Sequence, residues 1–124
     1  MTTRTEGLIG ESIAKEYLEK EGYRFLETNY SAKSGEIDII AFKNSTFVFV
    51  EVKRRTSNKY GLGLESVTPD KIRKIVKTAE IYLMSKGQYD SFCRFDVIEV
   101  DDVKVIEHIK NAFTKQDAGR KKHW

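Results

Sequence analysis

Hydrophobic residues recur along the chain with two different spacings, and the wider spacing predicts two helices. From about Thr5 to Lys20, apolar residues follow one another at steps of three and four, which places them on one face of a helix. A second helix is predicted to begin after Thr68, whose side chain caps the first turn, with Pro69 at the first helical position. It should run to about Lys86, where Gly87 ends it.

The remaining apolar segments are short and rich in β-branched and aromatic residues, which is typical of strands. Five strands are predicted, at residues 23–27, 37–42, 47–52, 93–100 and 103–109. The resulting order is αβββαββ, which indicates an α/β fold with helices packed on a mixed sheet. The 124 residues fit one domain, which we place at residues 1–113, and the basic segment 114–124 is expected to be a mobile tail.

The stretch GEIDIIAFKNSTFVFVEVK, residues 35–53, is typical of a hairpin but carries charged residues among its hydrophobic ones. If residues 43–46 form the loop, Asp38 lies directly across from Glu51 on one face of the sheet, and Lys53 follows on that face. A shift of the pairing by one residue would separate these side chains. The predicted cluster therefore depends on a loop of even length.

Both faces of this hairpin are expected to be covered. The face with Asp38 and Glu51 is apolar nearer the loop. The opposite face is apolar throughout and consists of Ile37, Ile39, Ala41, Val48, Val50 and Val52. The acids therefore depart from the alternation of a solvated strand. Either they form a site, or they pair with lysines of the chain and serve the structure alone.

Electrostatic repulsion in this cluster favours a bound cation. Opposed carboxylates in a sheet lie about 5 Å apart and repel by roughly 3 kcal/mol at an effective dielectric constant of ~20. Lys53 supplies one positive charge, whereas up to four acids surround it: Glu11, Glu36, Asp38 and Glu51. Glu11 reaches this group from the border of the first helix's apolar stripe. Oxygen ligands favour Mg²⁺, with Mn²⁺ as a substitute, and such an ion suits hydrolysis of a phosphodiester bond.

The charge distribution favours a nucleic acid as partner. The net charge is +3, and the basic residues fall in clusters. Arg54, Arg55 and Lys59 follow the hairpin, and Lys71 and Lys74 lie in the second helix. Such clusters suit a phosphate backbone, although a solvated lysine-rich surface would account for any one of them.

Several classes of protein are excluded by composition. Cys93 is the sole cysteine of the sequence, so an intramolecular disulfide and a cysteine-rich zinc site are excluded. No run approaches the ~18 apolar residues of a membrane helix. The first residues, MTTRTEGLIGESIAKEYL, lack the apolar stretch of a signal peptide. We therefore expect a cytoplasmic protein with no membrane partner.

Four segments together resemble a known family. GESIAKEYLEKEGY, GEIDIIA, FVFVEVKRR and TPDKIRKIVKTAEIYL are similar, in this order, to the YraN-type family of uncharacterised predicted endonucleases, over roughly residues 7–109. That family is related to archaeal Holliday junction resolvases and belongs to the PD-(D/E)xK nuclease superfamily. Asp38 with Glu51-Val52-Lys53 corresponds to the superfamily motif, and Ile37 stands in place of its proline.

The resemblance implies a restriction-endonuclease-like fold and a Mg²⁺-dependent endonuclease. It implies that Asp38 and Glu51 bind the metal, with Glu11 as an outer contact. It assigns Lys53 to catalysis and Lys71 to a phosphate contact, with a solvated lysine as the equal alternative for Lys71.

Three functions remain open from the sequence. The first is a nuclease, with DNA favoured over RNA and branched DNA as the resolvase-like substrate, for which a homodimer would supply two sites. The second is a nucleic-acid-binding module that holds a metal with little or no turnover. The third is a structural interaction protein whose acids pair with its own lysines. The presence of both Asp38 and Lys53 favours the nuclease.

Overall fold

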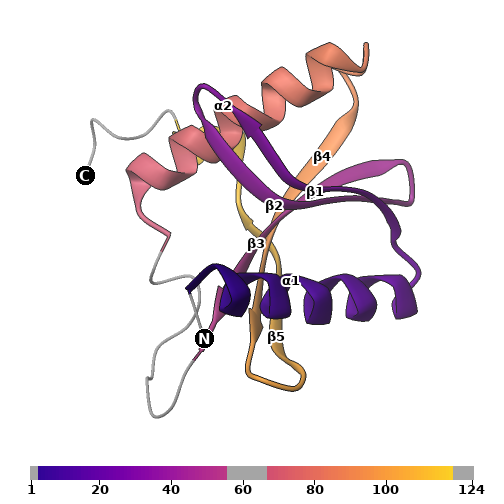
Figure 1. The fold of residues 1–124 in the computed structure, drawn as a ribbon. Helices are drawn as coiled ribbons and strands as arrows, with labels where there is room; N and C mark the ends of the chain where they lie inside the picture. Colours follow the sequence, from indigo (N-terminus) through magenta and orange to yellow (C-terminus); the bar gives the residue numbers. More distant parts are fainter. Residues whose placement is uncertain (1–2, 56–66, 119–124) are drawn as a thin grey trace.

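A computed structural model describes residues 3–55 and 67–118 of the chain. They form α1 (Thr3–Lys20), β1 (Arg24–Ala32), β2 (Gly35–Lys43), β3 (Thr46–Arg54), α2 (Pro69–Ser85), β4 (Phe92–Val100), β5 (Val105–Phe113) and α3 (Lys115–Ala118) (Figure 1). The predicted order αβββαββ is confirmed, and the short helix α3 lies in the segment that we expected to be a tail. In the described part of the chain, no helix is long and apolar enough to cross a membrane.

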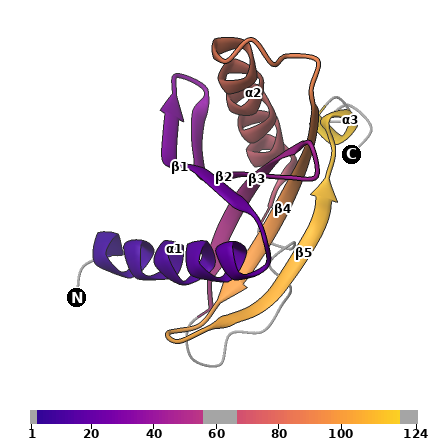
Figure 2. The same ribbon diagram turned by 90° about the vertical axis from the view of Figure 1, so that its right-hand side faces the viewer.

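The five strands form one mixed sheet in the order β1-β2-β3-β4-β5. Neighbouring strands are antiparallel except β3 and β4, which are parallel. A parallel pair needs a crossover connection, and α2 lies in the segment that joins these two strands (Figure 2). This α/β arrangement is compatible with the restriction-endonuclease-like fold.

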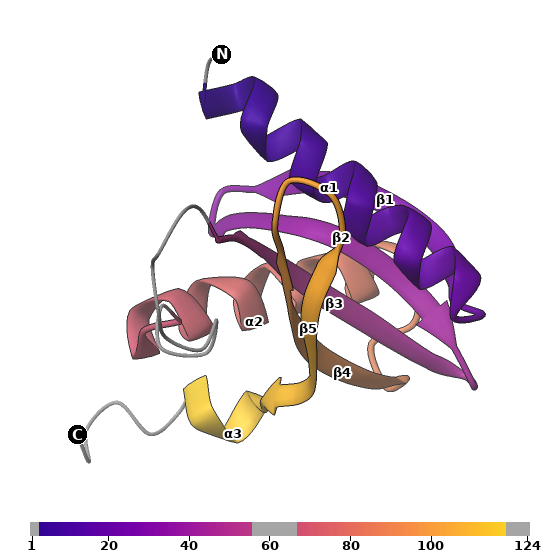
Figure 3. The same cartoon turned by 90° about the horizontal axis from the view of Figure 1, so that it is seen from below.

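Each face of the sheet carries a buried hydrophobic cluster, with α1 on one face and α2 on the other (Figure 3). The cluster on the α1 face comprises Ala14, Leu18, Tyr23, Ile39, Ala41, Val48, Val50, Ile98 and Val100. The cluster on the α2 face is larger and comprises Ile37, Ile40, Phe47, Phe49, Val67, Ile72, Ile75, Val76, Ala79, Tyr82, Leu83, Phe95, Val97 and Phe113. The expectation that both faces of the β2–β3 hairpin are covered is confirmed.

The turn between β2 and β3 is shorter than predicted, but the register is the same. Asn44 and Ser45 form the turn, and both have positive φ angles, of 52° and 59°. Two-residue turns of this conformation match the right-handed twist of the strands they connect. Because the loop has two residues rather than four, its length stays even, and Ile40 still pairs with Phe49 as predicted.

The strand boundaries differ most from the prediction in β1 and β5. β1 continues to Ala32 instead of ending at residue 27, because its polar second half pairs with β2. β5 continues to Phe113 rather than ending at Ile109, and it begins at Val105 rather than at Val103. The reason is the turn before it, where the carboxylate of Asp101 accepts hydrogen bonds from the backbone N–H groups of Val103 and Lys104.

β2 bends away from β3 near its middle. From the turn backward along β2, the positions that pair with β3 extend only to Ile39, opposite Val50, and residues 35–38 are not paired with β3. Beyond this point β1 and β2 curve together over α2 (Figure 1), and Ser34 Oγ lies 2.6 Å from Thr78 Oγ1 of α2. Ile37 therefore packs in the cluster on the α2 face. Its predicted place on the opposite face, with Ile39, was wrong, because strict alternation of side chains requires a strand that does not bend.

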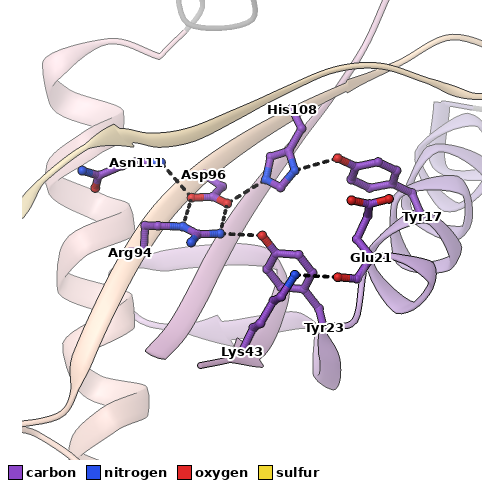
Figure 4. A network of polar contacts seen from close by, with 8 residues as sticks. All are labelled: Tyr17, Glu21, Tyr23, Lys43, Arg94, Asp96, His108 and Asn111. Atoms are coloured by element: carbon purple, nitrogen blue, oxygen red, sulfur yellow. Dashed lines mark hydrogen bonds and ion pairs between the residues drawn. The ribbon is translucent and has the colours of Figure 1, made fainter. Parts of the chain in front are cut away.

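A buried polar network holds α1 against the sheet (Figure 4). Asp96 of β4 has no exposed surface and accepts two hydrogen bonds of 2.9 Å from Arg94. The ring of His108 on β5 bridges two groups, with Nε2 at 2.7 Å from Asp96 Oδ2 and Nδ1 at 2.9 Å from Tyr17 Oη on α1. Arg94 also donates a 2.7 Å hydrogen bond to Tyr23 Oη. The network thus ties α1 to β4 and β5 through polar contacts as well as packing.

Candidate active site

The candidate site lies where β2 and β3 separate. Asp38 is the next residue of β2 beyond the last paired position, and its Oδ2 accepts a 2.8 Å hydrogen bond from the backbone N–H of Val52 on β3. The carboxylate thus accepts the hydrogen bond that a backbone carbonyl of β2 would accept if the β2–β3 pairing continued. The bend therefore fixes the side chain of Asp38 against β3.

Asp38 and Glu51 are brought together at this bend, and a hydrogen bond joins their side chains. Burial raises the pKa of Asp38 to about 8, and the hydrogen bond and negative charge of Glu51 contribute to the rise. Burial also acts to raise the pKa of Glu51, but the hydrogen bond from Asp38 and the positive charges of Lys53 and Lys71 outweigh it and lower that pKa. The pair therefore keeps a shared proton to a higher pH than two isolated carboxyl groups would, and the pKa directions favour Asp38 as its carrier.

Two lysines contact the same oxygen of Glu51. Lys71 Nζ lies 3.0 Å from Glu51 Oε2, and Lys53 Nζ lies 3.4 Å from it. Burial, followed by the contact with Lys71, lowers the pKa of Lys53 despite the charge of Glu51. Burial acts in the same direction on Lys71, but its hydrogen bond with Lys53 and the charge of Glu51 raise its pKa. Lys71 is thus the firmly charged partner of Glu51, and Lys53 gives up its proton more readily.

Glu11 of α1 lies beside this group without joining it. Its Oε1 accepts a 2.8 Å hydrogen bond from Asn29 Nδ2 on β1. Burial raises the pKa of Glu11, the hydrogen bond from Asn29 opposes the rise, and the charges of Glu36 and Glu51 add to it. Among the residues that the structure describes, no three Asp, Glu, His or Cys side chains are close enough together to bind one ion. Asp38 and Glu51 are therefore the pair that can share an ion, and Glu11 faces them at electrostatic range.

The donor set of this pair fits a hard divalent cation. Mg²⁺ binds through one or two carboxylates and keeps several waters, so two carboxylate side chains are sufficient. An ion of charge +2 can replace the proton of Asp38 and the ammonium group of Lys71 as the counter-charge of the pair. Zinc prefers histidine nitrogen and cysteine sulfur, and neither residue type is present in this group of described side chains.

The other residues predicted to contact nucleic acid are held in ion pairs where the structure describes them. Arg54 pairs with Asp102, Arg55 pairs with Glu99, and Lys74 pairs with Asp70 at 3.4 Å. Lys59 lies outside the described residues. Lys71 and Lys74 extend from the first turns of α2, so this end of the helix brings positive charge next to the carboxylate pair.

Sequence analysis missed Asn29 and the contact between Lys71 and Glu51. Asn29 lies in a polar run that resembles a loop, and its positive φ of 50° has no signature in the residue pattern. Lys71 and Glu51 are separated by a segment without periodicity, so their contact follows from the crossover of α2 and not from local spacing.

Comparison with known proteins places this arrangement in a family. The model of the family described as "Uncharacterised protein family UPF0102" matches residues 10–100. The UPF0102 protein of Alkaliphilus metalliredigens is 46% identical over 113 residues, which cover 90% of this chain and 99% of that protein. The UPF0102 protein TTE1452 of Caldanaerobacter subterraneus is 46% identical over 116 residues, covering 89% of this chain and 95% of the relative. A Clostridium perfringens relative is 50% identical over 95 residues, covering 77% of this chain and 78% of the relative.

Proposed function

This chain belongs to the uncharacterised protein family UPF0102, and we propose that it acts as a Mg²⁺-dependent nuclease that hydrolyses phosphodiester bonds of nucleic acid. The observation that carries the proposal is the Asp38–Glu51 pair, in which Glu51 is buried and contacted at one oxygen by Lys53 and Lys71, and the pKa of half-buried Asp38 is raised to about 8. Buried carboxylates with strongly shifted pKa values beside lysines are typical of functional sites.

In this proposal each side chain has a separate role. Asp38 and Glu51 would hold Mg²⁺, which would supply the polarisation of a phosphate oxygen and a lowered pKa of water. Lys53 stabilises the negative charge that develops on the phosphate during hydrolysis. Lys71 reaches Glu51 from α2 and would bind a neighbouring phosphate of the substrate. Glu11 acts as an outer contact to the hydrated ion.

We further propose DNA as the substrate. Lys71 contacts Glu51 from the first turn of α2, and Lys74, paired with Asp70, follows one turn later, which suits a phosphate backbone that passes along this helix. The resemblance to resolvases favours branched DNA. Two copies of the chain would then supply the two sites that a branched substrate requires.

One observation favours a second candidate function, a nucleic-acid-binding module with a metal site but little or no turnover. With the ammonium groups of Lys53 and Lys71 on Glu51 and a proton on Asp38, the pair is neutralised without an ion. A metal must displace the proton and Lys71 before it can act, and a weakly loaded site would bind substrate without cleaving it.

A cleavage assay with a matched control distinguishes the two candidates. Labelled four-way junction, flap, single-stranded and duplex DNA are incubated with the purified protein in Mg²⁺ or Mn²⁺. Asp38→Asn removes the shared carboxylate, and Asp90→Asn makes the same chemical change at an exposed position in the segment between α2 and β4. We expect cleavage by the wild type and by Asp90→Asn but not by Asp38→Asn. Binding without cleavage by the wild type would support the binding module, and cleavage by Asp38→Asn would exclude the pair as the active site.

A further inference from the structure

Asn29 occupies an unusual backbone conformation beside the candidate site. Its φ of 50° lies in the left-handed region, although it stands in the middle of β1 between two residues that pair with β2. Those pairs, Thr28 with Ile39 and Tyr30 with Ile37, place Asn29 across from Asp38. Residues with a Cβ atom rarely adopt this conformation inside a strand, and asparagine tolerates it better than most.

The side chain of Asn29 connects β1 to α1 at this point. Its Nδ2 donates a 2.8 Å hydrogen bond to Oε1 of Glu11. One carboxylate oxygen of Glu11 is therefore held by an amide, while the carboxylate lies within the electrostatic reach of Glu51. The backbone of α1 is fixed independently, because Tyr17 contacts His108 on the sheet. The position of the helix backbone does not by itself determine the rotamer of Glu11. The hydrogen bond from Asn29 holds that rotamer.

We propose that Asn29 is a positioning residue that orients the Glu11 carboxylate toward the Asp38–Glu51 pair, so that Glu11 meets the hydrated metal ion. This inference rests on the proposed function, since it assigns Glu11 to that ion. Partners of this kind, which orient a group around a metal without binding the metal, typically change metal affinity or activity by 10–100-fold when they are replaced.

A purely structural role for Asn29 makes a different prediction. In that case asparagine would be present only because it tolerates the left-handed bend of β1. Asn111 of β5 provides the comparison, because it has nearly the same φ, 54°, and its backbone N–H donates to Asp96 on the α1 face of the sheet. Glycine adopts positive φ without strain, so Asn→Gly at either position keeps the backbone and deletes the side chain.

The experiment compares wild type, Asn29→Gly and Asn111→Gly. We expect Asn29→Gly to weaken Mn²⁺ binding about tenfold by calorimetry and to raise the Mn²⁺ concentration for half-maximal DNA cleavage by the same factor. Its thermal unfolding midpoint should equal or exceed that of the wild type. Asn111→Gly should leave both metal readouts unchanged. Wild-type Mn²⁺ affinity in Asn29→Gly, or equal losses in both variants, would overturn the positioning role.

A measurement without metal separates this inference from the proposed function. Replacing Glu11 by alanine should shift the side-chain amide resonance of Asn29 in the metal-free protein and leave that of Asn111 in place. An unshifted Asn29 resonance would overturn the contact, whatever the activity. A wild-type protein that neither binds Mn²⁺ nor cleaves DNA would instead overturn the proposed function, and with it the metal-directed role of Asn29, even if the resonance shifts.

Discussion

Replacing Asp38 by asparagine should stabilise the metal-free protein while it removes the proposed activity. Asparagine resembles the protonated form of Asp38. Its Oδ1 can accept the hydrogen bond from Val52 N–H, and its Nδ2 can donate to Glu51, so both contacts of the protonated carboxyl group are kept. Because asparagine does not titrate, this position of the variant contributes no pH dependence to the free energy of unfolding.

The size of the effect follows from the pKa of Asp38. Its ordinary value is 3.8, and in the folded protein burial raises the pKa to about 8. Below about pH 4 the group is protonated in both states and has no effect on stability. As the pH rises, the unfolded chain releases the proton and the folded chain keeps it, so the free energy of unfolding falls by about 1.4 kcal/mol per pH unit until about pH 8. At pH 7, roughly three units above the ordinary value, the wild type has lost about 4 kcal/mol that the variant keeps.

Urea unfolding in the presence of a chelator tests this expectation from acid to mildly alkaline pH. The variant should match the wild type at acid pH. Its free energy of unfolding should increasingly exceed that of the wild type as the pH rises toward about 8, the pKa of Asp38 in the folded protein. Asp90→Asn serves as the control, and its difference from the wild type should not follow this course. Added Mn²⁺ should then stabilise the wild type and leave Asp38→Asn unchanged, because only a state that binds the ion is stabilised by it. A pH-independent difference, or a wild type that is the more stable protein at neutral pH without metal, would refute the reasoning.

Three further outcomes are expected. Lys53→Ala should keep Mn²⁺ affinity and slow cleavage by on the order of 100-fold, measured by calorimetry and single-turnover kinetics, and an undiminished rate would exclude the role of this lysine. Asp96→Asn should lower the free energy of unfolding by about 3 kcal/mol, because it leaves Arg94 with no buried counter-charge, and a urea midpoint near that of the wild type would contradict this. Replacing Lys71 and Lys74 together by alanine should reduce the slope of log binding constant against log salt by about 2, and an unchanged slope would place the path of the DNA elsewhere.

The elements and the central pairing could be predicted because they depend on local patterns. The helix from Pro69 follows from its cap and apolar stripe, and the β2–β3 register follows from two hydrophobic runs joined by a loop of even length. The bend of β2 could not be predicted, because it accompanies the packing of the turn between β1 and β2 on α2, and α2 is distant in the sequence. Because the bend was not predicted, Ile37 was assigned to the wrong face of the sheet. The hydrogen bond between Asn29 and Glu11 was missed as well.

In the candidate site, contacts within the hairpin could be predicted from the sequence, and the contact from α2 could not. Asp38, Glu51 and Lys53 belong to one hairpin, so their proximity follows from strand pairing. The second cation on Glu51 comes from α2, and its contact depends on the crossover that brings this helix to the sheet. The proton on Asp38 follows from burial, which a residue pattern indicates only in outline.

The topology of the sheet also has a consequence for the order of folding. β1, β2 and β3 form a meander whose contacts are local, whereas the parallel β3–β4 pair joins strands that the α2 segment separates in the sequence, so we expect the meander to form first. In that order, Asp38 and Glu51 would approach each other before Lys71 contacts Glu51. We expect refolding, followed by stopped-flow fluorescence of the chain's tyrosines, to be faster at mildly acid pH or with Mn²⁺ than at neutral pH without it. Equal rates in the three conditions would show that the acidic pair closes only after α2 has docked.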